Sequence, residues 1–159
     1  MDTVEEFLAH AIQIEQEAAL RFGQLADAMQ AQGNQEVGRL FRLLADYSQL
    51  HLADARERAG FRKLPDMGAG EFRWPDIESP EAAAIWAADP MLGREQALEV
   101  ALEAEQAGLD YYSDVMNTTT DAEIRAFAKE FSEEEAGHVA ELKRWIELHR
   151  AGKPLPTDV

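Results

Sequence analysis

The segment IRAFAKEFSEEEAGHVAELKRW, residues 124–145, carries a clear helical pattern. Its apolar side chains recur at spacings of three and four residues, which places them on one face of an α-helix. The same face carries Glu135 and His138 at its middle, with Phe131 before them and Leu142 after them. The segment therefore predicts a helix whose buried face is apolar at both ends and polar at its centre.

Three further segments repeat this pattern. We expect helices over residues 3–32, 35–59 and 94–116, and a fourth that begins with a capping box of Thr120 and Glu123 and continues to Arg150. Each predicted inward face is apolar at its ends and polar at mid-length. The four faces carry Val4, Leu8, Ala11, Glu15, Ala18, Phe22, Leu25 and Met29; Val37, Phe41, Leu44, Ser48, His51 and Ala55; Leu98, Ala101, Glu105, Gly108, Tyr112 and Val115; and Ile124, Phe127, Phe131, Glu135, His138, Leu142 and Trp145.

A long connection over residues 61–92 separates the second helix from the third and contains four of the six prolines. A short helix over residues 80–87 interrupts it. Short links join the first helix to the second and the third to the fourth as antiparallel hairpins, whereas the long connection lets the second and third helices run parallel. No segment has the alternation of a strand. We therefore predict an all-α, four-helix bundle in a single domain, residues 1–159, with a frayed tail over residues 151–159.

Composition excludes several classes of protein. The 159 residues include 15 Lys and Arg against 31 Asp and Glu, a net charge of −16. This charge repels nucleic acid and anionic membrane surfaces, so we expect neither as a partner. The chain contains no cysteine, which excludes disulfides, thiolate zinc sites and cysteine-held iron–sulfur clusters within it. We find neither a signal peptide nor a membrane-spanning run, and we expect a cytoplasmic protein.

The polar centres of the predicted faces are candidate metal ligands. Glu15, Glu105 and Glu135 fall on buried faces that carry no Lys or Arg, and His51 and His138 fall at the same level. Burying an unpaired carboxylate is strongly unfavourable, and carboxylate and imidazole are ligands that iron, manganese and zinc accept. One alternative is a metal-free polar network in which these groups share protons. For His51 alone, another alternative is a core histidine that donates to Glu15.

The arrangement resembles the ferritin-like di-metal carboxylate proteins, in which two helices supply one Glu each and the other two supply Glu-x-x-His. Within that superfamily the chain is most similar to the rubrerythrin branch. The likeness rests on the long middle connection, on Glu-x-x-His ending at His138, and on a Glu followed seven residues later by an aromatic residue, as Glu15 by Phe22 and Glu105 by Tyr112.

The resemblance implies roles for the five candidate residues. Glu15 and Glu105 match the terminal carboxylate ligands of the family, Glu135 a bridging carboxylate, and His51 and His138 the two imidazole ligands.

The second helix departs from the family pattern. Ser48 stands where the family has a second bridging Glu, and a serine hydroxyl is a poor ligand for these metals. Three carboxylates then supply a charge of −3 rather than −4 to two divalent ions. We therefore expect two iron ions, or one if Ser48 weakens the site, with zinc or manganese as alternative metals.

The resemblance also implies a function. Rubrerythrin-like proteins are non-haem iron proteins that reduce peroxide or oxidise ferrous iron. Because the chain has no cysteine-rich rubredoxin module, a redox cycle here requires an external electron donor. Family likeness further implies a homodimer. The alternative, from a different functional class, is a redox-silent bundle that binds zinc or a single ion, or a scaffold with a degenerate di-iron site.

Other conspicuous side chains are expected to serve structure rather than chemistry. We place His10 at the surface and Tyr111 in an exposed or semi-buried position. Glu134 lies out of phase with the ligand face and is expected on a solvated one. Trp74 is expected to cover the outside of the bundle.

Overall fold

The computed structural model describes residues 3–67, 72, 74, 80 and 93–155. This part of the chain contains four long helices, α1 (Val4–Ala31), α2 (Gln35–Ala59), α4 (Arg94–Thr118) and α5 (Ala122–Arg150), and no strand. The predicted all-α class and the four predicted helices are confirmed, with ends that differ by one or two residues. Most of the short helix predicted over residues 80–87, and residues 156–159 of the predicted tail, lie outside the described residues.

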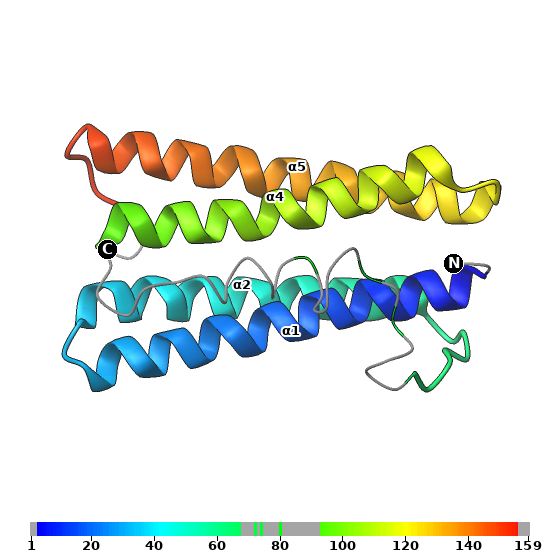
Figure 1. Ribbon diagram of the computed structural model, residues 1–159, viewed down its shortest axis with the longest axis horizontal. Helices are drawn as coiled ribbons and strands as arrows, with labels where there is room; N and C mark the ends of the chain where they lie inside the picture. Colours follow the sequence, from blue (N-terminus) through cyan, green and yellow to red (C-terminus); the bar gives the residue numbers. More distant parts are fainter. Residues whose placement is uncertain (1–2, 68–71, 73, 75–79, 81–92, 156–159) are drawn as a thin grey trace.

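The helices form two antiparallel hairpins that lie side by side, α1 with α2 and α4 with α5 (Figure 1). Helices α2 and α4 run in the same direction, since both begin at the same end of the bundle. Packing is dense within each hairpin and sparser between the two hairpins. This is the predicted ferritin-like topology. No helix in the described part of the chain combines the length and the apolar character needed to span a membrane.

The apolar core is divided into two clusters by a polar level at mid-length. One cluster contains Phe22, Phe41, Leu98 and Trp145; the other contains Phe7, Tyr112, Ile124 and Phe131. Each cluster contains side chains from all four helices. Burial of their apolar surface therefore stabilises the packing of the four helices at both ends of the bundle. The polar level between the two clusters is therefore enclosed from both sides.

The fourth long helix begins one residue later than predicted. Asp121 is the N-cap of α5, and its carboxylate accepts hydrogen bonds from the backbone N–H groups of Glu123 at 2.8 Å and Ile124 at 3.0 Å. Thr120 is exposed. The predicted capping box of Thr120 and Glu123 is therefore wrong, because the Asp carboxylate satisfies two unpaired N–H groups and places its negative charge at the positive end of the helix dipole.

Two aromatic residues that were expected nearer the surface are buried. His10 is fully buried, its Nδ1 donates to the carbonyl of Glu6 at 2.7 Å, and its ring packs edge-on against Phe72 and Trp74. Tyr111 is also buried, and its ring centroid lies 5.5 Å from that of Trp74. The predicted surface positions were wrong because side chains from the long connection cover this side of the bundle. Trp74 has the covering role that was expected of it.

Charged contacts link the two hairpins at opposite ends of α2. Arg94 of α4 pairs with Glu36 near the start of α2 at 2.8 Å. Near the end of α2, Arg58 pairs with Glu134 of α5, and its guanidinium carbon lies 5.2 Å from the centroid of the Phe131 ring. Glu134 is thus engaged across the hairpins rather than fully solvated as predicted. These ion pairs add a small contribution to the apolar clusters that span the two hairpins.

The N-cap assignment predicts unequal effects for two neighbouring substitutions. Asp121→Ala removes both capping hydrogen bonds and should lower the free energy of unfolding by about 1 kcal/mol. Thr120→Ala, its matched control, should change it by much less. Urea denaturation followed by circular dichroism, with chelator present, measures both values. Equal destabilisation by the two substitutions would contradict the assignment.

Candidate metal centre

The polar residues predicted on the four buried faces meet at mid-length of the bundle. Helix α1 contributes Glu15, α2 contributes His51, α4 contributes Glu105, and α5 contributes Glu135 and His138. The three carboxylates are almost fully buried, with relative exposures of 3%, 6% and 2% in chain order. We call these five residues the candidate metal centre.

Short contacts connect the members of the candidate metal centre. In the first hairpin, His51 Nδ1 lies 3.7 Å from Glu15 Oε2. In the second, His138 Nδ1 lies 3.4 Å from Glu105 Oε2 and 3.5 Å from Glu135 Oε2. The two imidazole rings stack between the hairpins, with centroids 3.8 Å apart and planes inclined by 10°. All five predicted residues therefore belong to one contiguous group.

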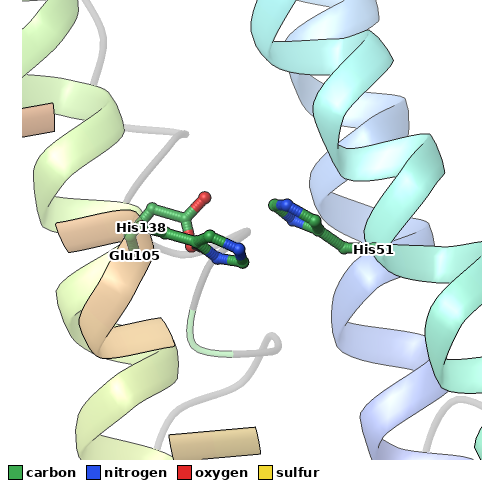
Figure 2. A group of neighbouring side chains, drawn as sticks. All are labelled: His51, Glu105 and His138. Atoms are coloured by element: carbon green, nitrogen blue, oxygen red, sulfur yellow. Dashed lines mark ion pairs between the residues drawn. The ribbon is translucent and has the colours of Figure 1, made fainter. Parts of the chain in front are cut away.

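Three of these residues converge most closely. One ligand atom each from His51, Glu105 and His138 lies within 4.8 Å of the others. Figure 2 shows the ring of His51 extending from α2 toward Glu105 and His138 on the opposite hairpin. The arrangement depends on helices from both hairpins, so their relative placement sets the spacing of the donor atoms.

Several donor atoms of the centre are buried without a hydrogen bond. Among the described residues, this is the case for Glu15 Oε2, His51 Nδ1, Glu105 Oε2 and His138 Nδ1. Leaving a buried polar atom in this condition costs about 1–3 kcal/mol. Two ligand atoms that are each about 2.1 Å from a tetrahedral ion lie about 3.4 Å apart, close to the carboxylate–imidazole separations here. The chemistry and the spacing of these donors therefore fit a bound metal ion.

Neighbouring charges shift the pKa values of two of these groups. Burial lowers the pKa of the His51 imidazole, but its contact with Glu15 and the charges of nearby carboxylates outweigh burial, so the pKa is raised. Burial raises the pKa of the Glu105 carboxyl. Contacts with Glu135 and His138 and the charges of the imidazoles outweigh that effect and lower the pKa to about 2. The site therefore favours positive charge at its centre, as a cation would supply.

Ser48 lies one turn before His51 on α2 and is buried, with a relative exposure of 2%. A glutamate at this position would lie on the same face of α2 as His51 and would point its carboxylate toward the centre. Because serine stands here, the centre contains three carboxylates rather than four.

A pocket of about 260 Å³ opens beside the centre. It is lined by Leu44, Tyr47, His51, Glu105, His138, Glu141, Leu142 and Trp145. The two leucines and the tryptophan lie on the predicted inward faces, as core residues, whereas Tyr47 and Glu141 were not predicted to belong to any site. These two lie off the predicted inward faces, so helical periodicity carries no signal that could have found them.

The sequence model of one protein family, Rubrerythrin, matches residues 6–146, a range that includes all five residues of the candidate metal centre. The structure is similar to the crystal structure of an uncharacterized conserved protein from Magnetospirillum magnetotacticum MS-1, with a TM-score of 0.67 and 35% sequence identity over 97% of each chain. No curated protein matches the sequence.

The geometry predicts that one carboxylate substitution abolishes metal uptake. Glu135→Ala removes a buried oxygen donor beside His138 and should leave less than about a tenth of the iron bound by the unaltered protein. The matched control is Glu133→Ala, which removes an exposed carboxylate two residues away on the same helix. Iron per chain is measured by plasma mass spectrometry after anaerobic ferrous loading, with circular dichroism to confirm folding. Full iron content in the Glu135 variant would contradict the assignment.

Proposed function

The chain belongs to the rubrerythrin family, and on that premise we propose that it binds iron at the candidate metal centre and reduces peroxide with electrons from ferrous iron. Membership of this family implies a di-iron carboxylate protein. The observation that carries the proposal is the meeting of buried carboxylates and imidazoles from four helices, four of whose donor atoms lack hydrogen bonds.

We assign each hairpin a share of the ligands. Glu15 and His51 would hold iron from the first hairpin, and Glu105 and His138 would hold it from the second. Glu135 lies beside His138 and would supply a further carboxylate oxygen. Carboxylate oxygen and imidazole nitrogen are suitable donors for ferrous and ferric iron. The two apolar clusters close the centre at both ends of the bundle, whereas the side chains of His51 and His138 are 23% and 28% exposed, so we propose that reactants enter through the lateral pocket.

When bound, ferrous iron supplies the two electrons that, with two protons, break the O–O bond of hydrogen peroxide and yield two water molecules. The residues of the chain would position the reactants for this step. Carboxylates and imidazoles that lie 3.4–3.7 Å apart would hold the iron beside the pocket, where the peroxide can reach it. The 159 residues contain no cysteine, so an electron donor outside them must restore the ferrous state. Oxidation of ferrous iron by peroxide has the same balance and differs only in whether the iron remains bound.

The proposal predicts a defined iron content and peroxide stoichiometry. After anaerobic ferrous loading, the protein should bind about two iron ions per chain and should consume about one peroxide for every two ferrous ions oxidised. Plasma mass spectrometry measures the metal, and stopped-flow absorbance follows the oxidation. Zinc-loaded protein is the control that cannot supply electrons. Binding of a single ion without peroxide consumption would contradict the proposal. It would instead favour the alternative of a redox-silent metal-binding protein, which the serine at position 48 suggests.

Restoring the fourth carboxylate gives a separate test of the site. Ser48→Glu should tighten binding of a second iron ion about tenfold or more, because another carboxylate then faces the centre. Gln49→Glu is the matched control, since it adds the same charge at an exposed neighbouring position. Competition with a chelator measures iron affinity in each variant. Equal affinities in the two variants would contradict the placement of Ser48 beside the metal.

A further inference from the structure

The pocket beside the candidate metal centre is larger than hydrogen peroxide requires. Its volume is about 260 Å³, whereas a cavity of about 10–15 Å³ is enough for one water molecule, and hydrogen peroxide has only one more oxygen atom. Pockets for drug-sized ligands begin at about 300 Å³, so this pocket suits only a compact organic molecule, with its polar end against the centre.

The wall of this pocket presents mainly apolar surface. Leu44, Leu142 and Trp145 are buried there. The polar groups of the wall bind one another, because the indole N–H of Trp145 donates to Glu141 at 2.8 Å and Arg144 donates to the same carboxylate. A ligand in the pocket thus meets aliphatic groups and an aromatic ring along its length.

Two parts of the pocket wall have different chemistry. The ring of Tyr47, a residue with a relative exposure of 37%, lies beside the buried ring of Trp145, with centroids 6.1 Å apart. His51, Glu105 and His138 form the other part, where their donor atoms converge at the centre. A molecule that packs against the apolar part would therefore have its polar end within reach of these three residues.

The charges around the pocket favour an uncharged ligand. Glu105 and Glu141 both line the pocket, and the whole chain carries a net charge of −16. The net charge of the chain would repel an anionic head group on approach, whereas inside the pocket the charge of a bound metal would offset that of Glu105 and Arg144 pairs with Glu141. A neutral head group avoids this repulsion, and the apolar wall stabilises the rest of the molecule by excluding water from it.

We propose that this pocket binds the apolar body of an organic hydroperoxide, of the compact aromatic or branched alkyl class, and directs its O–O group toward His51, Glu105 and His138. The inference rests on the proposed function, because it names the class of peroxide that is reduced. The O–O bond breaks, two electrons from ferrous iron and two protons are taken up, and the products are the corresponding alcohol and water. Because the alcohol retains the apolar body, it should bind to the same pocket.

Binding of the alcohol tests the pocket without any redox reaction. Zinc-loaded protein titrated with 2-phenyl-2-propanol in a calorimeter should bind it saturably. Leu142→Phe fills part of the pocket and should weaken binding about tenfold, and Tyr47→Ala, at a partly exposed position, should also weaken it. Leu50→Phe is the matched control, because Leu50 is exposed on α2 and does not line the pocket. Absence of saturable binding, or equal weakening by Leu142→Phe and Leu50→Phe, would overturn the inference.

Kinetics with two peroxides separate this inference from the proposed function. In the iron-loaded protein, Leu142→Phe should lower the ratio of kcat/KM for cumene hydroperoxide to kcat/KM for hydrogen peroxide about tenfold, whereas Leu50→Phe should leave this ratio unchanged. Reduction of hydrogen peroxide with no binding of the alcohol would overturn the pocket inference alone. Binding of the alcohol with reduction of neither peroxide would overturn the proposed function, and with it the assignment of hydroperoxide as the substrate.

Discussion

Burial of three carboxylates at one level of a helical bundle is the constraint on which the rest of this structure depends. Glu15, Glu105 and Glu135 are withdrawn from water. His51 contacts Glu15, and His138 contacts Glu105 and Glu135. Such a group is unfavourable unless positive charge compensates it. A bound cation supplies that charge, so metal binding and the stability of the bundle are linked in the function we propose.

The architecture around this level serves the same centre. Two apolar clusters enclose it from both ends, while each hairpin contributes a different part of the donor set. Both clusters include residues of all four helices, and the contacts of Arg58 with Glu134 and of Arg94 with Glu36 add charged links between the hairpins. Packing is sparser between the hairpins than within them and leaves space for the lateral pocket, through which a reactant can reach the imidazoles.

Local pattern predicted the helices well and their surroundings less well. Regular spacing of apolar residues identified all four long helices, since the period of the helix is a local property. The N-cap of α5 was misplaced by one residue because Thr120 and Asp121 are both capping residues, and only the backbone conformation decides between them. His10 was misplaced because Phe72 and Trp74, far away in the sequence, cover it.

The sequence by itself determined which residues share a buried face and at what level of each helix they lie. That information was enough to bring together the residues of the candidate metal centre, because helical period and rise place each side chain relative to its own helix. Only the tertiary structure decided the separations of 3.4–3.8 Å between them and the pocket that includes Tyr47 and Glu141. The physical reason is that distances between side chains on different helices depend on how the two hairpins pack, which no local periodicity encodes.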